Sequence, residues 1–384
     1  MHVEFATAGR IVFGAGAVAD LPHVVRSFGA SAFVVTGRHP HRHASIIESL
    51  AASDVACDLW PTSGEPTLAV IAEGVRRLRE GRAGVVVAIG GGSVIDAGKA
   101  VAALATNHGD ILDYLEVVGA GRPLLTAPLP CIAVPTTAGT GSEVTKNAVL
   151  GVPEHGIKVS LRGASMVPRV ALVDPELALD LPPAVTASTG LDALTQLIEP
   201  YVSSKANPLV DALCLEGLRR AAGAIRVVYA DGRDRTARES MALASLFSGL
   251  ALANAGLGAV HGLAAPIGGR VAAPHGAVCA ALLPHVCAMN LRAIEAREPA
   301  HAARDRYLTI ARLLTGNTTA SAADGIAWLR ALVADLGIPR LRVYGVGVSD
   351  IGLIADQAAR ASSMKANPIP LTRDELCEIL LTAI

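Results

Sequence analysis

The sequence predicts two domains: an α/β domain built on a parallel sheet over residues 1–181, and an all-helical domain over residues 182–384. In the first part, short apolar, β-branched segments alternate with segments of helical period, which is typical of a doubly wound sheet. From about Pro182, strand-like segments thin out and Ala- and Leu-rich segments of helical period dominate. We place the boundary near Leu181-Pro182-Pro183, because prolines commonly separate elements.

Four apolar segments have the length and composition of buried parallel strands: residues 32–36, 84–89, 131–134 and 170–173. Strands of this kind are covered on both faces, so they are apolar throughout rather than alternating with polar residues. Helical patterns at residues 68–78 and 94–104 lie between them. The order of these segments predicts a Rossmann-like sheet.

The overall composition favours a small-molecule ligand over a polyanionic partner. The chain has 384 residues, of which 51% are hydrophobic and 17% charged, and its formal net charge is −1. Such a balance gives no electrostatic reason to expect a nucleic acid or an anionic membrane as partner. The six cysteines form no CxxC pair, so we interpret them as reduced core residues of a cytoplasmic protein.

One apolar stretch, residues 241–269, lacks charges and is long enough to span a bilayer. It is interrupted by Gly249, Gly256, Gly258 and Gly262, and it contains His261, whose transfer into lipid is unfavourable. We therefore expect a buried helix pair joined by a tight connection. The first residues, Met1 to Phe5, also lack the basic and apolar regions of a signal peptide, which favours a cytoplasmic location.

A glycine-rich loop follows the predicted strand that ends at Ile89. Gly90, Gly91 and Gly92 lead directly into a helix, so the backbone can approach a ligand closely and direct free N–H groups at it. A pyrophosphate is the natural ligand of such a helix start. Glycines also occur in tight strand-to-helix turns for steric reasons alone, so this loop by itself leaves both interpretations open.

A second loop strengthens the interpretation as a phosphate site. Residues 135–143 leave another predicted strand and are rich in small hydroxyl side chains, which are suited to phosphate and ribose oxygens. Two such loops at the carboxyl ends of neighbouring strands predict a dinucleotide site. Neither loop has the GxGxxG spacing, and Lys99 lies too far along its helix for a Walker motif.

Polar residues of the second domain suggest a metal site. Asp192 and Gln196 are four residues apart and therefore share one face of a helix. His261 and His275 are too far apart to share a turn, so two elements must converge to bring them together. A single histidine in an apolar segment is more often a hydrogen-bonded core residue than a ligand, and the residues alone leave that alternative open.

The chain resembles the iron-containing, or group III, alcohol dehydrogenases, whose motifs it contains in family order over nearly its whole length. The matching segments are Gly90-Gly91-Gly92-Ser93 with Asp96 and Lys99, residues 135–145, Thr189 to Leu194, His261-Gly262-Leu263-Ala264, Pro274-His275-Gly276 and Ser363 to Pro368. The resemblance implies an NAD- or NADP-dependent oxidoreductase that interconverts an alcohol and an aldehyde or ketone in an interdomain cleft. It also implies a divalent metal, Fe²⁺ or Zn²⁺, that polarises the substrate oxygen, and a homo-oligomer.

The resemblance assigns roles to individual residues. The residues expected at the cofactor are Gly37, Arg38, Gly90, Gly91, Gly92, Ser93, Asp96, Thr136, Thr137, Thr140, Ser142, Asn147 and Lys158. The expected metal site consists of Asp192, Gln196, His261 and His275, and the residues expected to be catalytic are Asp192, His261, His275 and Lys158.

Two departures from the family pattern affect the expected chemistry. Gln196 stands where the family has a third histidine, and its amide oxygen is a weaker ligand for Fe²⁺ or Zn²⁺. We therefore expect a three-ligand site of lower affinity, with Gln196 as a weak or indirect fourth member. Gly37 stands where many NAD-preferring relatives have an acidic residue, and the basic Arg38 follows, which makes NADP use possible.

Three other functions remain as alternatives. The first is a metal-independent carbonyl or enoyl reductase of the maleylacetate reductase type, although those enzymes typically depart from the family at the position of Asp192. The second is a dehydroquinate synthase-like lyase, which needs a cluster of Lys and Arg, whereas residues 190–197 and 261–273 contain only Arg270. The third is a dinucleotide-binding protein without catalytic activity.

Overall fold

The computed structural model describes residues 3–384, and the chain divides into two compact units. The α/β unit contains residues 7–137 and 141–178, and the helical unit contains residues 179–384 together with the short segments 3–6 and 138–140. The α/β sheet domain and the all-helical domain expected from the sequence are both present.

A six-stranded sheet forms the centre of the α/β unit, and all its strands are parallel. The strands are β1 (Arg10–Phe13), β2 (Ser31–Thr36), β3 (Ala56–Pro61), β4 (Val85–Gly90), β5 (Cys131–Pro135) and β8 (Val170–Val173), in the order β1-β8-β5-β4-β2-β3. The four predicted strands are β2, β4, β5 and β8. The edge strands β1 and β3 were not predicted.

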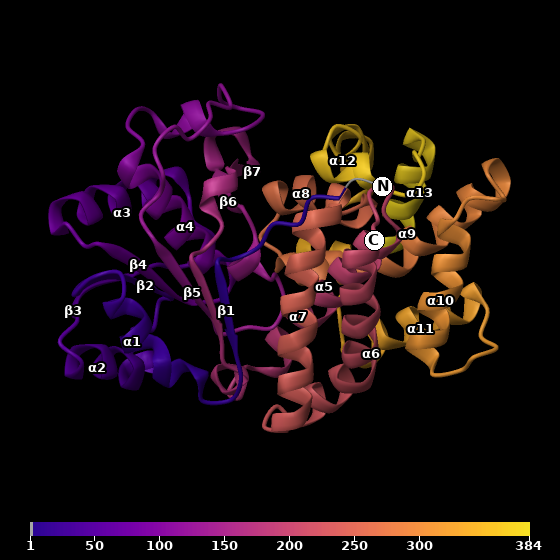
Figure 1. Cartoon of the computed structure of the whole chain (residues 1–384). Helices are drawn as coiled ribbons and strands as arrows, with labels where there is room; N and C mark the ends of the chain where they lie inside the picture. The colour runs from indigo at the N-terminus through magenta and orange to yellow at the C-terminus, as the bar shows by residue number, and fades with distance from the viewer. Residues whose placement is uncertain (1–2) are drawn as a thin grey trace. The chain divides into compact units, whose positions relative to one another are not determined.

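Helices cover both faces of this sheet (Figure 1). Helices α1 (Leu21–Arg26) and α2 (Ala44–Ala52) pack on one face, and α3 (Leu68–Gly81) and α4 (Gly92–Thr106) on the other. Side chains along β2 alternate accordingly: Phe33 and Val35 join the core under α3 and α4, whereas Val34 joins the core under α1 and α2. An antiparallel hairpin, β6 (Asn147–Val152) and β7 (Ile157–Arg162), packs beside α4.

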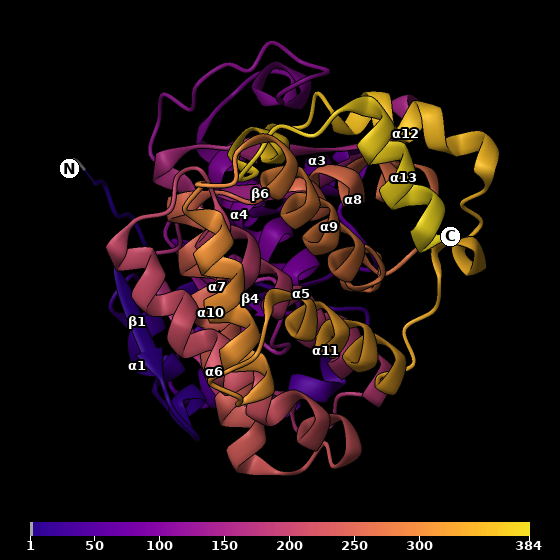
Figure 2. The same ribbon diagram turned by 90° about the vertical axis from the view of Figure 1, so that its right-hand side faces the viewer.

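Nine α-helices are described in the helical unit, which faces the viewer in Figure 2. They are α5 (Pro183–Val202), α6 (Pro208–Ala230), α7 (Arg235–Ala255), α8 (Ala259–Arg270), α9 (His275–Arg297), α10 (Ala303–Thr315), α11 (Ala322–Asp335), α12 (Ile351–Ala358) and α13 (Arg373–Ala383). Helix α5 is central: it packs against α6, α7 and α9, and almost every residue from Thr186 to Val202 is buried.

The apolar stretch 241–269 forms the expected helix pair. It includes the end of α7 and most of α8, which meet at an angle of 99°. Gly256 ends α7 with a φ of 72°, a conformation that residues with a Cβ rarely adopt. Helix α9 is also long and apolar enough to cross a membrane, but 83% of its most apolar window is buried inside the structure, as in the core helix of a folded domain.

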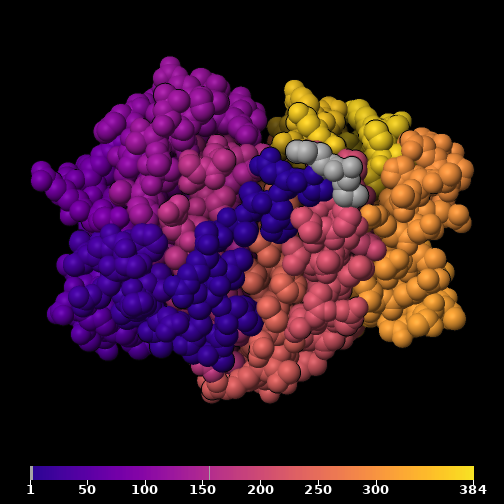
Figure 3. Space-filling model, viewed as in Figure 1, coloured from indigo at the N-terminus to yellow at the C-terminus, as the bar shows by residue number. Residues whose placement is uncertain are grey.

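Residues 3–6 attach to the helical unit through paired amide contacts. Asn254 of α7 accepts a hydrogen bond from the Ala6 backbone N–H at 2.7 Å, and its Nδ2 donates to the Ala6 carbonyl at 3.0 Å. Figure 3 shows this indigo segment on the molecular surface.

Candidate active site

Three polar side chains lie along one buried face of α5. Asp192, Gln196 and Glu199 occupy positions i, i+4 and i+7, and each is at most 5% exposed. A buried carboxylate is stable only when other groups compensate its charge. The neighbouring helices must therefore supply partners for Asp192 and Glu199.

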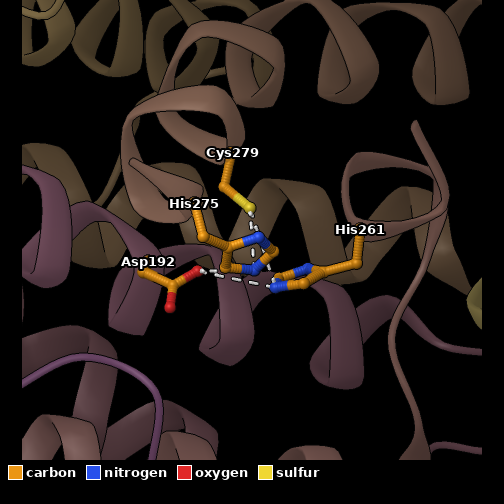
Figure 4. Close-up of side chains that lie close together, drawn as sticks. All are labelled: Asp192, His261, His275 and Cys279. Carbon is orange, nitrogen blue, oxygen red and sulfur yellow. Dashed lines mark hydrogen bonds and ion pairs between the residues drawn. The ribbon is translucent and has the colours of Figure 1, made fainter. Parts of the chain in front are cut away.

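Helices α8 and α9 supply those partners (Figure 4). The Nε2 atoms of His261 and His275 lie 3.5 Å and 3.7 Å from Asp192 Oδ1. Cys279, one turn after His275 on α9, places its Sγ 3.8 Å from His261 Nε2 and 3.6 Å from His275 Nε2. One ligand atom from each of these four residues lies within 4.8 Å of the other three.

Glu199 fixes the orientation of His261. Its Oε2 lies 2.6 Å from His261 Nδ1, and its Oε1 accepts a hydrogen bond from the Val260 backbone N–H at 2.7 Å. Because an ionised carboxylate only accepts, His261 Nδ1 carries a proton, and Nε2 is the ring atom that faces Asp192 and could bind a cation in place of its own proton. Carboxylates commonly orient metal-binding imidazoles in this way.

Gln196 contacts Asp192 rather than either imidazole. Its Nε2 donates to Asp192 Oδ2 at 2.8 Å. Asp192 Oδ1, which faces the two imidazole nitrogens, is buried and has no hydrogen-bond partner among the described residues, and the same holds for Gln196 Oε1. A buried carboxylate oxygen without a donor, next to two imidazole nitrogens, fits a bound cation.

The charges of the cluster also suit a site in which a cation replaces the protons of the two imidazoles. Burial opposes ionisation of Asp192, but the charges of His275 and His261 outweigh it and keep its pKa below the ordinary value. The charge of Cys279 raises the pKa of His275 to about 9. Burial opposes ionisation of Cys279 too, yet the two imidazoles lower its pKa. A cation would replace the imidazole protons as the positive charge beside these anions.

Gly276 allows α9 to approach α5 at the cluster. A Cβ at this position would lie 2.1 Å from the Ser188 carbonyl oxygen and 3.1 Å from Asp192 Cβ. Contacts that short do not occur, so a side chain would force the two helices apart. The glycine therefore keeps His275, the preceding residue, within reach of Asp192.

The loops expected to bind the cofactor follow three neighbouring strands of the α/β unit. The register pairs Thr36 with Ile89 and Gly90 with Pro135, so Gly37, Gly91 and Thr137 follow strand ends that lie side by side. From β2 the chain adds β3 on one side of the sheet, and it then returns to add β4, β5 and β8 on the other side. The point of reversal, between β2 and β4, is where ligands of open α/β sheets bind. Helix α4 starts at Gly92 with no side chain capping its first N–H groups.

A buried lysine anchors the second of these loops. The Lys99 ammonium, 1% exposed, donates to the Ser142 carbonyl at 2.9 Å and to Thr145 Oγ1 at 3.0 Å, and it pairs with Asp96 at 3.1 Å. Asp96 also accepts hydrogen bonds from Ser142 Oγ and from the Val149 N–H. Asp96 and Ser142 thus hold α4, the loop and the hairpin together, in addition to the cofactor contacts that we predict for them.

Other predicted residues lie in the same α/β unit. Asn147 begins β6, and its carbonyl accepts a third hydrogen bond from Lys99. Lys158 on β7 forms an ion pair with Glu65, so its ammonium is held in place. Thr140 belongs to the segment 138–140, which groups with the helical unit. The predicted catalytic and cofactor roles of these residues remain predictions.

The sequence analysis did not identify Glu199 and Cys279 as members of the site. Their spacing was informative: Glu199 lies seven residues after Asp192, and Cys279 lies four residues after His275, so each shares a helix face with a predicted ligand. The interpretation of all six cysteines as core residues leaves Cys279 out of the predicted site.

Comparison with known proteins gives consistent matches over almost the whole chain. Residues 8–175 match the family described as "Iron-containing alcohol dehydrogenase", and residues 186–384 match "Fe-containing alcohol dehydrogenase family, C-terminal". The chain is 38% identical over 323 residues to alcohol dehydrogenase 4 of Saccharomyces cerevisiae, covering 84% of this chain and 81% of the yeast protein. It is 33% identical over 384 residues to the NAD-dependent methanol dehydrogenase of Bacillus methanolicus, covering 97% of each. The crystal structure of a 1,3-propanediol oxidoreductase matches with a TM-score of 0.93 at 32% identity, covering 100% of both chains.

Replacing Gly276 tests whether helix approach assembles the cluster. In Gly276→Ala the new Cβ would displace α9 from α5, so we expect the free energy of unfolding to fall by about 1–3 kcal/mol. Zn²⁺ binding, measured by equilibrium dialysis, should weaken as His275 moves away from Asp192.

The matched control is Gly223→Ala in α6, where a Cβ meets nothing within 4 Å. This variant should gain about 0.5–1 kcal/mol in stability and bind Zn²⁺ like the wild type. Unchanged Zn²⁺ affinity in a folded Gly276→Ala protein would contradict this account of the helix contact.

Proposed function

Because this chain belongs to the iron-containing alcohol dehydrogenase family and is an alcohol dehydrogenase, we propose that it interconverts an alcohol and an aldehyde or ketone with NAD or NADP and a divalent cation. The observation that carries the metal-dependent part is the buried Oδ1 of Asp192, which faces His261 and His275 but has no hydrogen-bond partner among the described residues.

Asp192, His261 and His275 would hold the cation, and each has a group that positions it. Gln196 fixes the Asp192 carboxylate through Oδ2, Glu199 fixes the His261 ring, and Gly276 brings His275 close. A divalent cation supplies Lewis-acid chemistry there: it stabilises negative charge on an alcohol or carbonyl oxygen, which favours hydride transfer.

The loops of the α/β unit would bind the dinucleotide. The uncapped start of α4, with Gly91, Gly92 and Ser93, suits a pyrophosphate, because its N–H groups and helix dipole favour an anion. Thr136 and Thr137, at the end of the neighbouring strand β5, would supply further donors. The nicotinamide ring supplies the hydride acceptor or donor. The NAD-dependent relative from Bacillus methanolicus supports this assignment.

We propose short-chain alcohols as the substrate class. The support is the activity for which two relatives are named, a methanol dehydrogenase and a 1,3-propanediol oxidoreductase.

The lyase alternative requires free cations to hold a phosphorylated substrate. Arg270 is the one Lys or Arg of residues 261–273, and it forms an ion pair with Asp350 at 2.7 Å. That arginine is thus engaged within the protein. The metal-independent alternative has no specific structural support, because Asp192 is present and lies beside two imidazoles.

Metal removal tests the proposed function. We expect chelator-treated protein to lose alcohol-dependent reduction of the nicotinamide cofactor, and added Zn²⁺ or Fe²⁺ to restore it. In Asp192→Asn the rate should fall by about 10³-fold, corresponding to several kcal/mol of lost charge stabilisation, without restoration by metal. Cofactor binding, followed by nicotinamide fluorescence, should be retained in both preparations. A metal-free protein that turns over at the original rate would contradict the proposal.

A second experiment tests cofactor choice. Gly37 has no carboxylate to repel the 2′-phosphate of NADP, so we expect the wild type to use both cofactors. An added Cβ at Gly37 meets only Val94 Cγ2, at 3.9 Å, so a side chain fits. In Gly37→Asp the ratio of kcat/KM for NADP to that for NAD should fall by at least about 10-fold, through repulsion of the phosphate.

The control for this experiment is Gly37→Asn, which has the same size without the charge. Its cofactor ratio should remain within about threefold of the wild type, a change of well under 1 kcal/mol. If the ratio is the same in Gly37→Asp and Gly37→Asn, residue 37 does not decide the cofactor.

A further inference from the structure

We propose that the Cys279 thiolate is a ligand of the cation together with Asp192, His261 and His275, and that Gln196 is not. This inference rests on the proposed metal-dependent function. It makes the site an Asp-His-His-Cys centre that selects Zn²⁺ or Co²⁺ over cations that prefer oxygen ligands.

The first argument is that Gln196 has its amide nitrogen turned toward Asp192. Only the NH₂ group of an amide can donate to an ionised carboxylate, so the atom 2.8 Å from Asp192 Oδ2 must be the nitrogen. An amide nitrogen that donates a hydrogen bond has no lone pair to offer a cation. Gln196 therefore acts through its nitrogen on the carboxylate that would bind the cation, and its Oε1 makes no hydrogen bond to either imidazole or to any other described residue.

The second argument is the geometry of the remaining four groups. In a tetrahedral zinc site with Zn–S of about 2.3 Å and Zn–N and Zn–O of about 2.0–2.2 Å, the sulfur–nitrogen edges are about 3.6 Å and the oxygen–nitrogen edges about 3.4 Å. The Cys279 Sγ atom lies 3.6 Å and 3.8 Å from the two imidazole nitrogens. Asp192 Oδ1 lies 3.5 Å and 3.7 Å from the same nitrogens. These four of the six edges match a tetrahedral site to within about 0.3 Å, and all four ligand atoms lie within 4.8 Å of one another.

The third argument is that the polar groups around Cys279 are the other three members of the cluster. It is completely buried, and its described hydrogen-bonding contacts are the two imidazole nitrogens and the Asp192 carboxylate. Cys214 on α6 is a buried cysteine that serves for comparison. It belongs to the apolar core of the helical unit and has no histidine contact among the described residues. Cys279 is therefore placed as a ligand, whereas Cys214 is placed as a core residue.

The fourth argument concerns charge. The Asp192 carboxylate and the Cys279 thiolate together carry two negative charges, which a divalent cation neutralises within a buried site. The additional carboxylate, Glu199, is separated from the cation by the His261 ring and is satisfied by two N–H donors. A soft thiolate ligand favours Zn²⁺ and Co²⁺ over Mg²⁺ and Mn²⁺.

The experiment uses Co²⁺ as a spectroscopic probe of the full-length protein. Metal-depleted protein is titrated with Co²⁺, and two signals are recorded: the visible d–d bands, which report bound cobalt, and the near-ultraviolet charge-transfer band, which appears only when a thiolate is bonded to it. We expect the wild type to show both signals. Gln196→Ala and the control Cys214→Ala should also show both, whereas Cys279→Ala should lose the charge-transfer band.

Zn²⁺ affinity gives an independent measurement. In Cys279→Ala we expect it to fall by at least about 100-fold, and in Gln196→Ala by about 10-fold, as for a residue that positions a ligand. X-ray absorption of the zinc-loaded wild type should show one sulfur neighbour at about 2.3 Å. This measurement on the wild type decides the question even where a variant does not fold.

The outcomes distinguish this inference from the proposed function. Cobalt bound to the wild type without a charge-transfer band, or with the band retained in Cys279→Ala, overturns the cysteine ligand and leaves the metal-dependent dehydrogenase intact. A wild type that binds neither Co²⁺ nor Zn²⁺ overturns both.

Discussion

The arrangement of the helical unit around its site depends on one buried charge, the carboxylate of Asp192 in the middle of α5. Its residue is 2% exposed, and an isolated charge in such surroundings costs several kcal/mol even after the protein relaxes. The compensation comes from two other helices, because α8 brings His261 and α9 brings His275. Gly276 permits the close approach of α9 that this requires.

The need to compensate the buried Asp192 charge also explains why further polar residues contact Asp192 and His261. Gln196 binds one oxygen of Asp192, and Glu199 binds the far nitrogen of His261. Each fixes the direction in which a ligand atom points, and neither needs to touch a cation to do so. The α/β unit uses a comparable device: Lys99 is buried in order to fix the loop that contains Ser142, although no predicted phosphate contact involves its ammonium.

The sequence predicted the strands of the sheet interior better than the strands at its edges. Strands β2, β4, β5 and β8 are apolar throughout because both faces of the sheet are covered, and they were predicted. Strands β1 and β3 lie at the sheet edges. Arg10 begins β1, Asp58 lies within β3 and Pro61 ends it, so neither has the pattern of a buried strand. Cys279 was missed for the opposite reason: its neighbours in sequence are apolar, and only the convergence of α8 and α9 shows that it lies between two imidazoles.

The most direct measurement is a crystal structure of the zinc-loaded protein, with diffraction recorded on both sides of the zinc absorption edge. The account predicts one strong anomalous peak in the helical unit, about 2.0–2.2 Å from Asp192 Oδ1 and from the Nε2 atoms of His261 and His275. An active, zinc-loaded crystal with no anomalous peak at these three atoms would contradict it.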